Sequence, residues 1–308
     1  MTATPVPINP ILPAKRSART ERTTWPTVLL FLGPALVLIL IFLVYPVIST
    51  LRMSVDRGLG GEFTRFVGLQ NYIDLFETPS FVGSIVNNIL WMVFYTGFVI
   101  LFGLIIAVVA MRVRYESIIK GIVFLPMAIA ATALSVIWTF VYALDPHIGL
   151  LNALLGVVHL GPVSWLGDSG FVNAALIAVG IWGSTGFATV ILSAALKGIP
   201  AEVLEAARTD GAGELQIFWR IIVPMVSLPI SVLAVTLIVN VIKLFDIPYV
   251  MTQGGPGNAS RVIAFEMYKQ DFSAGQFGKA AAVAVIMLAL LIPVMIFNVR
   301  RFRSSAVV

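Results

Sequence analysis

The residues whose types and spacing favour specific chemistry lie in one polar stretch, residues 197–224. The stretch carries four acidic and three basic residues and separates two long apolar segments. Pro200, just after Gly198, favours the first turn of a short helix, and Gly211 favours its end. Its second half is predicted to be a helix that runs to Pro224. An ordered loop of this kind indicates docking to a partner, although a solvated amphipathic loop lying on lipid has the same composition.

The two faces of this loop are expected to serve different contacts. The first helix places Glu202 and Glu205 along one side, and the small residues Ala206 and Ala207 let another protein surface approach closely. The second helix is predicted to pack on its own protein through an apolar face with helical spacing. That face comprises Leu215, Phe218, Trp219 and Ile222.

Several other chemistries are disfavoured because the sequence lacks the residues that they require. The chain has no cysteine, which removes disulfides, thiolate catalysis and iron–sulfur chemistry. Its two histidines, His147 and His159, lie in one loop without partner ligands, so no metal site is predicted. Gly278-Lys279-Ala280 lacks the spacing of a phosphate-binding Walker A loop. A membrane-embedded enzyme is therefore a poor alternative.

The elements that hold the polar loop are long apolar segments. Hydrophobic residues make up 59% of the 308-residue chain and charged residues only 11%, against about 25% in soluble domains. A helix of about 20 residues crosses a bilayer, and six segments reach that length. They are residues 27–49, 84–110, 118–143, 171–195, 225–245 and 279–299. We therefore predict an all-α membrane protein with six transmembrane helices over residues 25–308, bent at prolines such as Pro126.

The charge distribution predicts which side of the membrane each loop occupies. Most of the twenty Lys and Arg residues lie in the tail 1–24, the link around Arg114, the polar loop and the C-terminal end. Because basic residues mark the cytoplasmic side, both termini and the polar loop are expected there. The net charge of +5 is thus a topology signal, and no nucleic-acid partner is predicted.

The acidic residues bear on the energy source. All fifteen lie outside the predicted spans or at their edges. Ion-driven transporters commonly carry carboxylates near the middle of the membrane, where they bind the coupling ion. The sequence therefore disfavours an ion-coupled transporter and requires that energy come from a partner.

The polar loop resembles a known motif. Glu205-Ala206-Ala207, Gly211, Ile221 and Val223-Pro224 look like the EAA motif of permease subunits of bacterial ATP-binding-cassette (ABC) importers, with Val223 where leucine is usual. The resemblance covers nearly the whole chain and is nearest to the sugar permeases, α-glucoside permeases in particular. Further similar segments are FVGLQNYIDLF (66–76), FLPMAIAATALSVIWTFVY (124–142), GLLNALLG (149–156) and MTQGGPGN (251–258).

This resemblance implies a type I importer in the bacterial inner membrane. Its partners would be a second homologous permease, two cytosolic ABC ATPases and an extracytoplasmic sugar-binding protein. The chain would bind no cofactor itself, because ATP and Mg²⁺ are used by the ATPases. The residues implied in ATPase coupling are Glu202, Glu205, Ala206, Ala207, Asp210, Gly211 and Pro224.

Candidates for the sugar pathway are in-span aromatic and hydrogen-bonding residues, because sugars are bound by ring faces and polar groups. They are Asn240, Trp182, Thr185, Trp138, Tyr142, Asn88 and Trp91. The alternative roles are interfacial anchoring for the aromatic residues and helix–helix hydrogen bonding for the asparagines. A polyol or glycerol-phosphate cargo is the alternative to a sugar. The segment 246–275 either contacts the binding protein or is a plain connector.

The loop assignment yields a direct test. Glu205→Lys reverses the charge at the expected ATPase contact, so we expect normal membrane insertion and loss of transport. Membrane fractionation measures the first and solute uptake the second. Normal uptake by the variant would contradict the coupling role.

Overall fold

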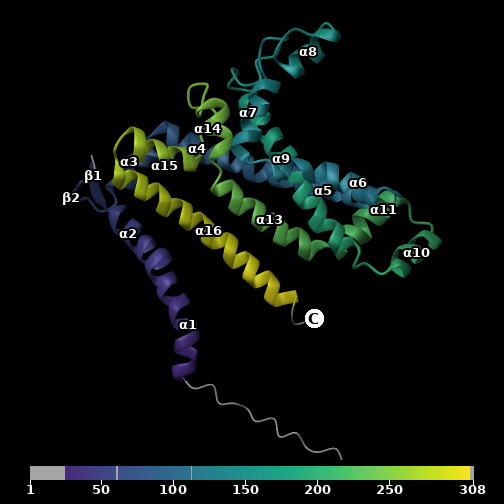
Figure 1. The fold of residues 1–308 in the computed structure, drawn as a ribbon, viewed down its shortest axis with the longest axis horizontal. Coiled ribbons are helices and arrows are strands. Elements are labelled where there is room, and N and C mark those ends of the chain that lie inside the picture. The colour runs from purple at the N-terminus through teal and green to yellow at the C-terminus, as the bar shows by residue number, and fades with distance from the viewer. Residues whose placement is uncertain (1–24, 60–61, 112, 306–308) are drawn as a thin grey trace, which may run out of the picture. The chain divides into compact units, whose positions relative to one another are not determined.

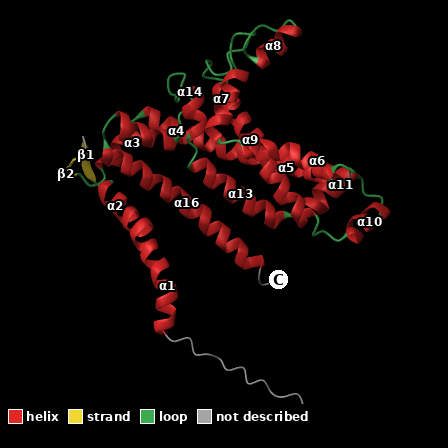
Figure 2. Ribbon diagram, in the orientation of Figure 1, coloured by secondary structure: helices red, strands yellow, loops and turns green. Residues whose placement is uncertain are grey.

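The computed structural model describes residues 25–59, 62–111 and 113–305 and divides into two units, 1–48 and 49–308. The tail 1–24, with its predicted basic cluster, and Arg112 lie outside the described residues. The described chain is helical apart from one small hairpin, which confirms the predicted all-α class (Figures 1 and 2).

The first unit is one apolar helical run that continues into the second unit. It comprises α1 (Trp25–Ile39), the π-helical segment η1 (Leu40–Val44) and the beginning of α2 (Tyr45–Met53). Pro34 lies inside α1 without ending it.

The second unit contains the remaining elements. Its first half comprises β1 (Asp56–Leu59), β2 (Glu62–Phe66), α3 (Gln70–Glu77), α4 (Pro79–Leu90), η2 (Trp91–Tyr95), α5 (Thr96–Ala110), α6 (Glu116–Phe124), η3 (Leu125–Ala128), α7 (Ala131–Val141) and α8 (Leu150–Val157). Its second half comprises α9 (Val172–Leu196), α10 (Ala201–Thr209), α11 (Glu214–Ile217), η4 (Phe218–Ile222), α12 (Val223–Met225), α13 (Ser227–Ile242), α14 (Asp246–Thr252), α15 (Ile263–Tyr268), η5 (Lys269–Ser273) and α16 (Phe277–Ser305).

Six regions of the described chain are long and apolar enough to cross a membrane, as the sequence predicted, but two of them are bent. The four unbroken ones are Leu29–Met53, Pro79–Ala110, Val172–Leu196 and Phe277–Arg301. The third and fifth regions are helix pairs. Glu116–Ala128 meets Ala131–Val141 at 98°, and Glu214–Met225 meets Ser227–Ile242 at 72°.

The two bends have local causes. In the third region, Pro126 lies in the 3₁₀ turn η3, and Ile129 then adopts an extended conformation. Proline lacks the N–H that would continue the helical ladder. In the fifth region, the break follows Pro224 and falls at Val226. A bend at Pro126 was expected from the sequence, whereas the break at Val226 was not.

Helix α9 is the centre of the packing. Small residues let neighbouring helices come close to it. A Cβ added to Gly186 would lie 2.3 Å from the carbonyl oxygen of Val123 on α6, and one added to Gly103 on α5 would lie 2.5 Å from the Cβ of Ala188. Figure 1 shows α5, α6 and α9 gathered in one bundle, and α13 beside α16.

The two ends of the second unit carry different elements. The short helix α10 and the end of α16 lie at one end, while α3 and α15 lie at the other (Figure 1). At the latter end, Lys279 on α16 lies 3.1 Å from the Asp74 carboxylate on α3. Hydrogen bonds from Gln70 and Lys279 hold the pKa of Asp74 below its ordinary value.

The close contact at Gly186 predicts a steric effect. Gly186→Ala places a methyl group against the Val123 carbonyl, so we expect destabilisation of about 1–3 kcal/mol. Thermal unfolding of the purified protein in detergent measures it. Gly97→Ala is the matched control, because a Cβ there meets nothing within 4 Å, and it should be neutral or slightly stabilising. Equal unfolding temperatures of the two variants would contradict the close contact between Gly186 and α6.

Candidate functional site

The polar loop contains a short helix that projects from the body of the protein. Figure 2 shows α10 joined by loops to α9 and α11. Glu202, Glu205, Ala206 and Asp210 are all exposed. These side chains therefore form an accessible surface, with acidic groups around a small alanine.

The opposite side of α10 faces the rest of the chain. Leu204 and Ala207 are partly buried and pack against the main core. Ala207 thus differs from Ala206, although both were expected to face a partner. Gly211 has φ +81°, the left-handed conformation that favours glycine. Across this turn, Arg208 Nε lies 3.0 Å from Glu214 Oε1, which braces α10 against α11.

The apolar face predicted for the helix after Gly211 is wrong at two positions, Leu215 and Trp219. Ile217 and Ile222 are buried, whereas Leu215 is 74% and Trp219 54% exposed. Leu215 and Ile217 both lie in α11, and Ile217 is the one that packs in the main core. The π-helical segment η4 begins at the next residue and shifts the side chains after it away from the 3.6-residue pattern. Pro224, in α12, lies just beyond this segment.

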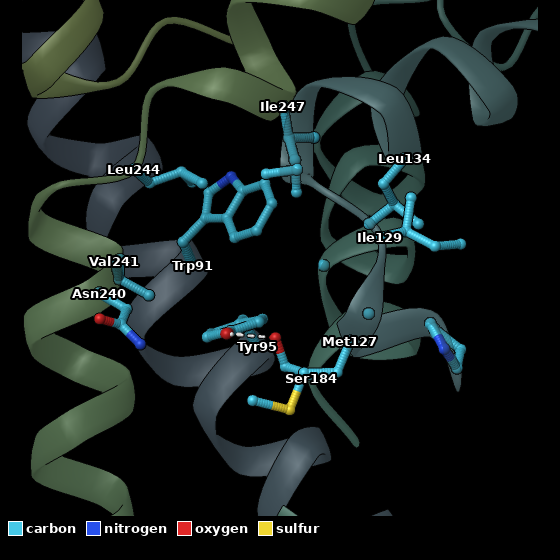
Figure 3. A pocket seen from close by; sticks show the side chains of 14 residues that line it. Trp91, Tyr95, Met127, Ile129, Leu134, Ser184, Asn240, Val241, Leu244 and Ile247 are labelled. Atoms are coloured by element: carbon cyan, nitrogen blue, oxygen red, sulfur yellow. Dashed lines mark hydrogen bonds between the residues drawn. The ribbon is translucent and has the colours of Figure 1, made fainter. Parts of the chain in front are cut away.

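A second feature is a cavity of about 260 Å³ among the spanning helices (Figure 3). Most of its walls come from η2, η3, α9 and α13, with further residues from α7 and α14. Its lining comprises Trp91, Tyr95, Pro126, Met127, Ile129, Ala131, Leu134, Gly180, Gly183, Ser184, Asn240, Val241, Leu244 and Ile247.

The lining is apolar and aromatic with a few polar groups. The Tyr95 hydroxyl donates to Ser184 Oγ at 2.8 Å, and Asn240 faces the same cavity from α13 (Figure 3). Trp91 fits against α9 because a Cβ at Gly180 would lie 2.8 Å from its ring. The lining includes no charged side chain. Such a surface suits an uncharged solute with hydroxyl groups.

The structure distributes the predicted pathway residues over three environments. Trp91 and Asn240 line the cavity. Trp138, Tyr142 and Trp182 form a separate aromatic cluster, in which the Trp138 ring centroid lies 5.2 Å from that of Tyr142 and 5.5 Å from that of Trp182.

The third environment is the interior of the helix bundle. The Thr185 hydroxyl is buried and donates to the Ile181 carbonyl within α9 at 2.7 Å.

Asn88 and its neighbour serve as backbone anchors. Asn88 Nδ2 donates to the Val241 carbonyl at 3.0 Å, and Asn88 Oδ1 accepts from the Ile263 N–H at 2.8 Å. Asn87 Nδ2 donates to the carbonyls of Ala259 and Arg261 at 2.8 and 2.7 Å. The head of the second span therefore holds the segment 259–263 in place, which is the hydrogen-bonding alternative considered for the asparagines.

Sequence reasoning had not singled out several lining residues. Ser184 and Gly180 lie one turn apart on α9, so their i, i+4 spacing could have marked a common face. Pro126 and Met127 reach the cavity only because the third span bends there. Among the described residues, no group of three or more His, Asp or Glu side chains is placed to hold a metal ion.

The site lies in a chain of membrane-spanning helices, and comparison with known proteins identifies its family. Residues 99–301 match the family described as the binding-protein-dependent transport system inner membrane component, and the chain belongs to it. The protein is thus a multi-pass inner-membrane permease subunit of a binding-protein-dependent ABC transport system. Such subunits are transport components rather than enzymes.

Two curated relatives are similar over most of the chain. The osmoprotective compounds uptake permease protein GgtC of Synechocystis sp. is 47% identical over 90% of this chain and 99% of its own. The alpha-glucoside transport system permease protein AglF of Rhizobium meliloti is 42% identical over 88% of this chain and 81% of its own.

Solved structures share the fold. One chain of a bacterial ABC transporter involved in the import of alginate matches with a TM-score of 0.77 and 22% identity, over 90% of this chain and 95% of its own. A chain of such a transporter in complex with an alginate pentasaccharide-bound periplasmic protein matches with a TM-score of 0.73 and 23% identity, over 88% of this chain and 92% of its own. These matches confirm the predicted importer fold.

The anchoring role of Asn88 can be separated from a cavity role. Asn88→Leu leaves the buried Ile263 N–H unpaired and removes one of the donors to the Val241 carbonyl, so we expect a loss of about 1–3 kcal/mol in the free energy of unfolding. Asn240→Leu, at an exposed cavity position, should change it by no more than about 0.5 kcal/mol. Thermal unfolding in detergent compares the two variants. Equal losses would rule out the proposed division of roles.

Proposed function

We propose that the chain carries an uncharged α-glucoside or a related small glycosylated solute. The observation that carries this proposal is the uncharged cavity, where Tyr95, Ser184 and Asn240 supply hydrogen-bonding groups beside apolar and aromatic walls. Its volume of about 260 Å³ suits a small solute better than a long polysaccharide. The names of the relatives, an α-glucoside permease and a permease for osmoprotective compounds, point to the same class.

A polyol or glycerol-phosphate cargo is the second candidate. A permease of Pectobacterium atrosepticum described for sn-glycerol-3-phosphate is 28% identical over 91% of this chain. A phosphate is bound most readily by Arg or Lys, and neither residue lines this cavity. The uncharged lining therefore favours the neutral solute, unless the second permease supplies the cation.

We further propose that α10 docks on a cytosolic ATPase through Glu202, Glu205, Ala206 and Asp210. All four are exposed, and the Arg208–Glu214 ion pair spans the Gly211 turn between α10 and α11. ATP and Mg²⁺ would be bound by the ATPase. Closure of two ATPases would then move α10 as a rigid body and reshape the pathway.

The same proposal sets the orientation in the membrane. Arg300 and Arg301 lie near the end of α16, where Arg301 donates to the Ser227 carbonyl at the start of α13. This end of α16 lies toward α10 (Figure 1). Because basic residues favour the cytoplasmic side, this end and both termini are assigned to the cytoplasm. The opposite end, with α3 and α15, would then receive solute from the external binding protein.

The cargo can be tested in proteoliposomes that contain the complete transporter and its binding protein. We expect uptake of maltose, trehalose or sucrose, which are α-glucosides, and little uptake of glycerol 3-phosphate. Asn240→Ala should raise KM for the transported sugar about tenfold, equivalent to about 1.4 kcal/mol.

The control is Thr236→Ala, one turn away on α13, whose hydroxyl donates to the Val232 carbonyl at 3.0 Å. Thr236 does not line the cavity, so KM should not change. Preferential uptake of glycerol 3-phosphate, or an unchanged KM in Asn240→Ala, would refute the proposal.

A further inference from the structure

An ion-pair cluster joins the loop that carries α10 to the beginning of helix α6. Lys197 is the first residue after α9 and begins the loop that carries α10. Its Nζ lies 3.1 Å from Glu116 Oε1, the carboxylate of the first residue of α6. Lys120, one turn further along α6, pairs with the same oxygen. One carboxylate therefore sits between two lysines and ties the loop to α6.

Helix α6 is also fixed to α9 at a second point. The Val123 carbonyl and the Phe124 Cα lie so near Gly186 that an added Cβ would be 2.3 and 2.8 Å from them. Backbone contact of this kind leaves little freedom to slide, because no flexible side chain lies between the helices. With the Glu116–Lys197 pair at its end, α6 is held at two points along α9.

The far end of α6 reaches the solute cavity. The helix runs directly into η3, where Pro126 and Met127 line the cavity wall. Beyond η3, the chain turns by 98° into α7. A displacement of α6 thus moves this part of the wall, while the bend gives the chain a place to flex.

We propose that Glu116 is a positioning residue that links displacement of the α10 loop to the cavity wall at Pro126 and Met127. The proposal rests on the proposed coupling role of α10. Movement of the loop root at Lys197 pulls Glu116, and α6 carries η3 with it. Because a partly exposed pair contributes only about 0–1 kcal/mol, we expect its loss to leave folding intact and to weaken the transmission by a modest factor.

The absence of cysteine from the chain allows a direct test. Leu125→Cys introduces one label site on η3, at a side chain that is 67% exposed and outside the cavity lining. An environment-sensitive fluorophore there reports movement of η3 in the complete transporter when ATP is added. Glu116→Gln and Lys197→Gln should each reduce this signal about twofold or more, with ATP hydrolysis retained.

Lys120→Gln is the matched control, because it removes a lysine from the cluster but leaves the Glu116–Lys197 pair. It should keep the wild-type signal. The double variant Glu116→Gln/Lys197→Gln should be no worse than either single variant, since both remove one interaction. The charge swap Glu116→Lys/Lys197→Glu should restore the signal if assembly and folding are intact.

Unchanged fluorescence in both single variants, additive losses in the double variant, or failure of the charge swap would overturn the proposal. Failure of the underlying coupling function is distinguishable. In that case ATP would produce no signal at position 125 even in the otherwise wild-type chain, and Glu205→Lys would leave uptake intact.

Discussion

The close approach of helices to α9 is the constraint on which the rest of the structure depends. Gly180, Gly183 and Gly186 follow one another at intervals of three, and an added Cβ at each would come within 3 Å of a neighbouring element. Those neighbours are Trp91, Leu134 and the backbone of α6. In a bilayer, where lipid is as apolar as the side chains, such intimate van der Waals contact is a main source of helix association. The position of the second and third spans against α9 follows from it.

The cavity is a consequence of this packing combined with the bent third span. Gly180 and Gly183 line the cavity from α9, and the turn at η3 brings Pro126 and Met127 to the same space. A straight third helix would have kept all its backbone hydrogen bonds, but different side chains would then have lined the cavity. The bend is compatible with a membrane because freed backbone groups that lie within protein, rather than against lipid, can find partners there.

Polar residues in the spans divide between backbone anchoring and the lining of the cavity. Asn87 and Asn88 are committed to backbone groups of the distant segments 241 and 259–263. Asn240 keeps its side chain at the cavity. The proposed link through Glu116 belongs to neither group, because it joins two connections outside the apolar core. Anchoring is thus visible in the hydrogen bonds, while solute binding and transmission are the roles that we propose for the other two groups.

The sequence by itself determined the six apolar regions, the exposed loop helix ending near Gly211 and the family. These features depend on local signals: span length, glycine and proline positions, and the spacing from Glu205 to Pro224. Only the tertiary structure decided which polar residues face the cavity. The hydrogen bond from Asn88 to the Val241 carbonyl joins residues 153 positions apart, which no local pattern reports. Likewise, packing against the main core buries Ile217 and leaves Leu215 and Trp219 exposed, because the neighbouring helices, and not the local sequence, decide which side of a short helix is covered.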